Sequence, residues 1–217
     1  MPVKTIVSYD DTANDHDALA LGGLLARAGA QLTLAYVRHT SAGADDREAQ
    51  ELLDRGASQL GLGEGSTRSV VHASTGQGLI ELAVAEGADL VVFGSDYRTA
   101  PGSVQPGTSA QRLLDGGPVA VAIAPAGLRD HPDFAVTRIG VLGEDGAAEA
   151  TAANLAGALG AETVAGQGKV DLLVIGSRPE VRSGHVLLTA LAAYEIDKAT
   201  FPVLVVARDK PLAFAAG

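Results

Sequence analysis

One short motif occurs twice in this chain, and its repetition constrains the fold more than any other feature of the sequence. The first copy reads Ala88-Asp-Leu-Val-Val-Phe-Gly-Ser95 and the second reads Val170-Asp-Leu-Leu-Val-Ile-Gly-Ser177. Three further pairs of segments match in the same order, namely 5–9 with 139–142, the alanine-rich stretches that end at residues 30 and 161, and 118–122 with 202–206. One such match can arise by chance, but four in the same order favour a shared ancestry. We therefore expect two related units.

Apolar runs of strand length alternate with alanine- and leucine-rich stretches of helical length, which is typical of an α/β fold with a parallel sheet. The matched segments lie closer together in the second unit, so we expect that unit to have lost its middle. We assign residues 1–125 to a complete unit, the proline- and glycine-containing segment 126–136 to a linker, and 137–217 to a shortened unit. The strands predicted for the first unit are 5–9, 32–37, 69–72, 89–93 and 118–123, and its helices lie at about 12–28, 45–60, 78–86 and 108–114.

Charge and composition exclude several classes of function. The 217-residue chain carries a formal net charge of −10, with its basic residues scattered, so nucleic acid and anionic membranes are poor partners. It contains no cysteine, which rules out disulfides, thiolate metal sites and cysteine nucleophiles. No apolar run approaches the roughly 20 residues that span a bilayer, and the first residues do not form a signal-peptide pattern. We expect a cytoplasmic protein.

The sharpest local feature follows the predicted strand at 89–93. Several small residues lead to Thr108-Ser-Ala-Gln111, which has the form of a capping box and predicts a helix that begins at Thr108. Ligands of open parallel sheets bind beyond the carboxyl ends of strands where the strand order reverses, and a helix start there favours anions. An anion site is one interpretation of this loop. A capped helix after a glycine turn is the other.

Four motifs of the first unit resemble those of one family. The first predicted strand ends in Tyr9-Asp10-Asp11-Thr12, the fourth is Ala88-Asp-Leu-Val-Val-Phe-Gly-Ser95, the loop spacing is Gly94, two residues, Tyr97, nine residues, Gly107-Thr108, and the fifth strand begins Pro118-Val-Ala-Val. The universal stress protein family has V-D-G-S, A-D-L-I-V-x-G-S, G-x2-G-x9-G-S/T and C-P-V-L-V-V at these places. The chain is similar to that family over nearly its whole length.

This resemblance implies a Rossmann-like fold of the adenine nucleotide alpha hydrolase type, with strand order 3-2-1-4-5. It also implies that ATP, with Mg²⁺, or AMP binds at the carboxyl ends of strands 1 and 4. The aspartate after strand 1 would lie near ribose and adenine, a strand-2 residue against adenine, and the loop glycines and hydroxyl at the phosphates. The residues implied are Asp10, Thr12, Val37, Gly94, Gly107, Thr108 and Ser109.

Tyr97 departs from the family pattern because it replaces the second loop glycine, which allows close phosphate approach and positive φ. Two outcomes follow. The tyrosine fills the phosphate position and closes the site, or its ring stays outside and the remaining loop holds a shorter phosphate chain, which favours AMP over ATP.

The second unit has lost more of the motif. We place Gly143 at the position of Asp10, and Pro179 and Thr189 at the two later glycine positions, so we expect no nucleotide there. Family members dimerise through strand 5, so the resemblance implies that the strands starting at Pro118 and Pro202 pair within the chain as an internal pseudo-dimer. A homodimer of the whole chain is a further expectation.

The resemblance implies a stress-linked binding or regulatory module, with an unidentified protein partner and without catalysis. A slow ATP hydrolase and a pure protein-interaction module are the alternatives. Three acidic residues, Asp10, Asp11 and Asp15, could hold Mg²⁺, but acids at a helix start more often complement the helix dipole. We assign no catalytic or metal-binding residue.

Overall fold

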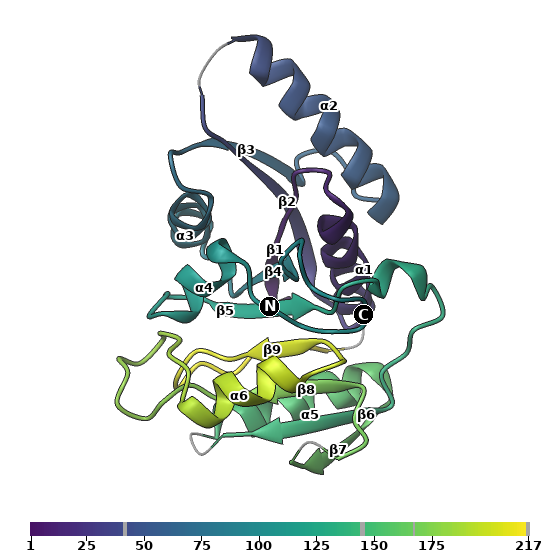
Figure 1. Cartoon of the computed structure of the whole chain (residues 1–217), viewed down its shortest axis with the longest axis vertical. Coiled ribbons are helices and arrows are strands. Elements are labelled where there is room, and N and C mark those ends of the chain that lie inside the picture. The colour runs from purple at the N-terminus through teal and green to yellow at the C-terminus, as the bar shows by residue number, and fades with distance from the viewer. Residues whose placement is uncertain (41–42, 144–145, 167, 216–217) are drawn as a thin grey trace.

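The computed structural model describes residues 1–40, 43–143, 146–166 and 168–215. In this described part, nine strands form one sheet in the order β3-β2-β1-β4-β5-β9-β8-β6-β7 (Figure 1). The strands are β1 (Lys4–Ser8), β2 (Gln31–Arg38), β3 (Thr67–Val71), β4 (Leu90–Gly94), β5 (Ala120–Ala124), β6 (Arg138–Leu142), β7 (Glu162–Ala165), β8 (Leu172–Ile175) and β9 (Val203–Val205). The helices are α1 (Ala13–Arg27), α2 (Gly43–Leu60), α3 (Thr75–Glu86), α4 (Thr108–Leu114), α5 (Ala147–Leu159) and α6 (Ala190–Lys198), with a 3₁₀ helix η1 (Leu128–Asp130).

The first five strands are parallel and have the predicted order 3-2-1-4-5. Two apolar cores lie on opposite faces of the sheet. Side chains of α1, α2 and α5 contribute to one core, and those of α3, α4 and α6 contribute to the other. The direction of travel along the sheet reverses between β1 and β4, so their carboxyl ends form the edge at which ligands of such sheets bind.

Strands β5 and β9 join the two units, as predicted, and they run antiparallel. Their register is symmetric, since Val121 lies opposite Val205 and Ile123 lies opposite Val203. Two backbone hydrogen bonds repeat this symmetry across the junction: Val104 N donates to Ala199 O at 3.1 Å, and Val186 N donates to Gly117 O at 2.8 Å. A loop of each unit thus donates a backbone hydrogen bond to the other unit, as in a two-fold symmetric dimer.

The repeated motif plays the same structural role in both units. Ser95 Oγ donates to Ala124 O at 2.7 Å, and Ser177 Oγ donates to Val206 O at 2.7 Å. The aspartates of the motif, Asp89 and Asp171, each accept a hydrogen bond from the backbone at the start of β1 or β6. Residues of the motif therefore connect β4 and β8 to the neighbouring strands by hydrogen bonds.

The described residues of the second unit contain no counterparts of α2, β3 and α3. The chain from β7 to β8 passes over Gly140 of β6 instead. A Cβ atom at Gly140 would lie 2.6 Å from Gly166 O and 3.1 Å from a side-chain carbon of Val170. The missing side chain at Gly140 is what allows this short connection to cover the sheet.

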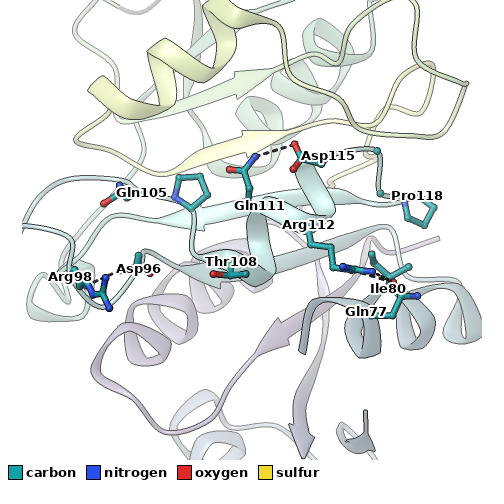
Figure 2. A pocket seen from close by; sticks show the side chains of 13 residues that line it. Gln77, Ile80, Asp96, Arg98, Gln105, Thr108, Gln111, Arg112, Asp115 and Pro118 are labelled. Atoms are coloured by element: carbon teal, nitrogen blue, oxygen red, sulfur yellow. Dashed lines mark hydrogen bonds between the residues drawn. The ribbon is translucent and has the colours of Figure 1, made fainter. Parts of the chain in front are cut away.

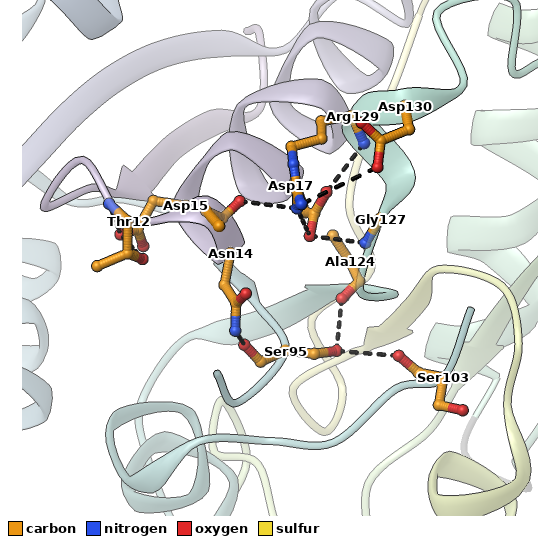
Figure 3. Close-up of polar contacts among 11 residues, drawn as sticks. Thr12, Asn14, Asp15, Asp17, Ser95, Ser103, Ala124, Gly127, Arg129 and Asp130 are labelled. Carbon is orange, nitrogen blue, oxygen red and sulfur yellow. Dashed lines mark hydrogen bonds and ion pairs between the residues drawn. The ribbon is translucent and has the colours of Figure 1, made fainter. Parts of the chain in front are cut away.

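The segment 126–136, predicted as a linker, packs closely on the first unit. Asp17 of α1 is fully buried and accepts hydrogen bonds from Gly127 N, Arg129 N and Arg129 Nη1, each at 2.9 Å (Figure 3). These bonds fix η1 against α1. Backbone polar groups on this turn are thereby satisfied by a side chain distant in sequence.

Candidate functional site

The turn after β1 begins the site. Asp11 has a φ of 64°, in the left-handed region that favours glycine, and it stands where the family motif has glycine. Its carboxylate accepts a hydrogen bond from Tyr9 Oη at 2.6 Å and pairs with Arg55 Nη2 at 2.7 Å. The Tyr9 hydroxyl and Arg55 lower the pKa of Asp11. Asp11 therefore ties the turn to α2.

Thr12 forms the predicted N-cap of α1, and the capping box is complete. Asp15 Oδ2 accepts hydrogen bonds from Thr12 N at 3.0 Å and from Asp10 N at 3.3 Å. Burial, followed by the neighbouring Asp10 carboxyl, raises the pKa of Asp15 from 3.8 to about 7. Asp10 itself is exposed at the edge of the sheet.

Gly94 lies directly beneath the start of α1. A Cβ atom at Gly94 would be 1.9 Å from Asn14 O, so no other residue fits there. The Asn14 side chain donates to Ser95 O, which brings the first turn of α1 onto the loop after β4 (Figure 3). The ends of β1 and β4 are thus in contact, as the predicted site requires.

The capping box predicted at Thr108 is wrong. Gly107 is the N-cap and Thr108 is the first helical residue, and the cap carries no side-chain hydrogen bond. Gln111 Nε2 donates to Asp115 Oδ1 at 3.1 Å instead of folding back to the cap. The Asp96 carboxylate lies beside the cap, because its Oδ2 is 3.8 Å from the position of a Cβ on Gly107.

Tyr97, on which the two outcomes drawn from the sequence depend, is an exposed residue. The residue is 72% exposed. Its hydroxyl accepts a hydrogen bond from Arg98 Nε at 2.7 Å, and the Arg98 guanidinium lies 4.8 Å from the ring centroid. The ring is therefore held at the surface by its neighbour Arg98.

Val37 and Ser109 are placed less favourably than the resemblance implies. The Val37 side chain is buried under α3, where a Cβ on Gly78 would lie 3.0 Å from its Cγ1. Ser109 is half-buried on the side of α4 that meets α3, with its carbonyl oxygen 3.1 Å from a Cβ on Gly76. The Val37 side chain is therefore used in packing against α3.

A polar groove that the sequence did not predict runs along α4 (Figure 2). Its volume is about 890 Å³, and it extends from Asp96 and Thr108 to Gln77 of α3 and Pro118 before β5. Gln77 Oε1 accepts hydrogen bonds from Arg112 Nε at 3.2 Å and Nη2 at 3.0 Å. Asp96 and Thr108 border both this groove and the site at the strand ends.

The comparisons with known proteins identify the family. The profile of the universal stress protein family matches residues 3–125, more than half of the chain. The chain belongs to this family.

Solved structures extend the likeness over both units of this universal stress protein. A functionally unknown protein from Pseudomonas aeruginosa PAO1 has a TM-score of 0.66 and 17% identity, with 96% of this chain and 93% of that chain covered. A universal stress protein from Archaeoglobus fulgidus DSM 4304 has a TM-score of 0.56 and 15% identity, with coverages of 96% and 99%. No curated protein matches the sequence. At these identities the two structures show a common fold for the whole chain.

Two of the three acidic residues at the start of α1 in this universal stress protein make contacts within the chain. Asp11 is directed to Tyr9 and Arg55, and Asp15 is directed to the cap of α1. Among the residues that the structure describes, no three His, Asp or Glu side chains are arranged to hold a metal ion. Within the same residues, no helix has the length and apolar character that crossing a bilayer requires.

The strand register corrects one correspondence in the second unit. Thr5 lies opposite Leu90 and Ile139 lies opposite Leu172, so Gly143 corresponds to Tyr9 rather than to Asp10. The counterpart of Asp10 is residue 144, which lies outside the described residues. Thr189, at the position of Gly107, is the N-cap of α6, and its side chain accepts a hydrogen bond from Ala192 N at 3.0 Å.

Proposed function

We propose that this universal stress protein is a non-catalytic binding module whose first unit takes an adenine nucleotide with a short phosphate chain, AMP in preference to ATP. The observation that carries the proposal is the exposure of Tyr97, whose ring and hydroxyl contact Arg98. From this we infer that the strand-end site stays open although the family glycine is missing. The contact between Asn14 and the loop at Ser95 supports it, because it keeps Asp10, Gly94 and the loop to Gly107 at one edge.

The preference for AMP rests on charge. The Asp96 carboxylate lies beside Gly107, the residue at which the resemblance implies phosphate binding, and so it adds a negative charge near that position. Repulsion at short range grows with the number of phosphate charges, and the chain as a whole carries a net charge of −10. A monophosphate meets less of this repulsion than a triphosphate does.

Binding without turnover is the second part of the proposal. The one carboxyl at the site with a pKa raised to about 7 is that of Asp15 among the described residues. Its Oδ2 already accepts three hydrogen bonds, from Asp10 N, Thr12 N and Thr12 Oγ1, so it is engaged in capping α1. A general base needs a free lone pair directed at the reacting water.

Thermal unfolding with millimolar AMP, ADP and ATP tests the proposal. A ligand at about 100 times its dissociation constant adds roughly 2.7 kcal/mol to the free energy of unfolding, which raises the Tm by several degrees. We expect the largest shift with AMP and no shift in Asp10→Ala. If no nucleotide changes the Tm, the protein-interaction module is the better account.

A further inference from the structure

The second unit contains a cavity of about 330 Å³ at the carboxyl ends of β6 and β8, beneath the first turn of α6. Its walls include Leu142, Ile175, Ser177, Pro179, Thr189 and Leu191. In the sheet order β9-β8-β6-β7, the chain reverses its direction of travel between β6 and β8. The cavity therefore lies at the ligand-binding edge of the second unit.

Around this cavity, the second unit has apolar residues at positions where the first unit has polar ones. The matching hydrogen bonds of Ser95 and Ser177 set the correspondence between the loops, and it places Ala190 and Leu191 at the positions of Thr108 and Ser109. Pro179 takes the place of Tyr97 in the same loop. Gly176 keeps the position of Gly94, but the other two residues implied at the phosphates, Gly107 and Thr108, are replaced by Thr189 and Ala190.

The hydroxyls that remain in the cavity wall are already used. Ser177 Oγ donates to Val206 O at 2.7 Å and accepts from Leu187 N at 3.4 Å. Thr189 Oγ1 accepts from Ala192 N at 3.0 Å. No charged side chain is present among the described residues that line the cavity. A charged ligand would lose its hydration here without compensation.

The rim of the cavity exposes apolar surface. Leu191 is 55% exposed, and Tyr194, three residues further along α6 and so on the same side of the helix, is 57% exposed. Exposed apolar side chains beside a concave apolar wall are typical of small-molecule sites. A water molecule takes about 30 Å³ of liquid volume, so the cavity has room for a ring system of about ten non-hydrogen atoms.

We propose that this cavity is a binding site for a small uncharged molecule with an aromatic ring, distinct from the nucleotide site of the first unit. Leu142 contacts the ring from the wall of the cavity, and Leu191 covers the ring from the rim.

Indole is the probe for this site, because the chain contains no tryptophan and the emission of indole is observed without interference from that residue. In equilibrium dialysis, the full chain should bind one indole with a dissociation constant of about 1 mM or lower. Leu191→Ser should weaken binding by about tenfold, since it removes the apolar rim. Ser109→Leu, the reciprocal change at the matching position of the first unit, should leave binding unchanged.

Pro179→Asp is the second variant, since it places a carboxylate at the rim on an exposed loop, and it should weaken binding in the same way. Circular dichroism checks that each variant is folded. Absence of saturable binding to the full chain, equal binding by Leu191→Ser and the parent, or displacement of indole by AMP would each overturn the proposal.

Discussion

Asp11 shows how a residue can replace a glycine without changing the turn. Its φ of 64° costs a residue with a Cβ about 1 kcal/mol, and its carboxylate offsets that cost through Tyr9 and Arg55. Asp11→Ala keeps the strained φ and loses the carboxylate contacts, whereas Asp11→Gly loses only the contacts. We therefore predict that Asp11→Ala lowers the free energy of unfolding by about 1 kcal/mol more than Asp11→Gly does.

Urea denaturation of both variants measures this difference, and Arg55→Ala serves as the control because it removes the ion pair and leaves the backbone of the turn intact. Equal stability of the alanine and glycine variants would contradict the account of the turn.

Asp15 gives the stability of the molecule a pH dependence of known sign. Its pKa is raised from 3.8 to about 7 in the folded state, so between these values the folded chain binds more protons than the unfolded chain. The contribution of Asp15 to stability therefore falls as the pH rises through this interval. The side chain of Asp15→Asn cannot ionise. We therefore predict that the free energy of unfolding of this variant, relative to that of the parent, increases as the pH rises from 5 to 8. A constant difference across this range would show that Asp15 is not the titrating group.

At the scale of elements, η1 depends on one buried carboxylate. Asp17 accepts two backbone and one side-chain hydrogen bond from the segment that joins the units. Asp17→Ala leaves these donors without their acceptor, and we predict a loss of about 3 kcal/mol or more in the free energy of unfolding. Asp130→Ala is the control, because Asp130 is an exposed acidic residue of η1. It should change the free energy of unfolding by less than about 0.5 kcal/mol. Similar losses in both variants would show that η1 is not held by Asp17.

The elements also show where sequence patterns stop being informative. The cap at Thr12 was predicted correctly because the residues that form it are neighbours in sequence. The start of α3 was placed at residue 78, yet the helix begins at Thr75, because Gly76 and Gly78 resemble a turn. Both glycines are needed for close contact with other elements, Gly76 with α4 and Gly78 with Val37. Such contacts join residues distant in the chain and leave no local pattern.

At the scale of the whole molecule, the family resemblance implies both the strand order of the first unit and the pairing of β5 with β9, and the structure confirms both. Two features of the fold were not predicted. The packing of 126–136 depends on Asp17, more than a hundred residues away, and the cover of the shortened unit depends on Gly140. The residues that the resemblance implies at a nucleotide are a third case. The motifs predict Asp10, Gly94 and Gly107 at one edge of the sheet, but no local pattern indicates that Asp96 lies beside the cap of α4.

The second unit covers the edge of β5, and this has a measurable consequence. A chain that ends at residue 125 exposes that edge, and unpaired strand edges of apolar sequence associate. We predict that the fragment 1–125, once shown by circular dichroism to be folded, has twice its own mass in size-exclusion chromatography with light scattering. The full-length chain is the reference, since its β5 edge is already paired. A folded monomeric fragment would mean that β9 is not needed to protect β5.

The measurement that tests the account most directly is calorimetric titration of the full chain with AMP and with ATP, repeated on Asp96→Ala. We predict that AMP binds the parent more tightly than ATP, and that the difference narrows in Asp96→Ala because the repelling carboxylate is gone. Tighter binding of ATP than of AMP by the parent, or an unchanged ratio in the variant, would contradict the assignment of the strand-end site to a short phosphate chain.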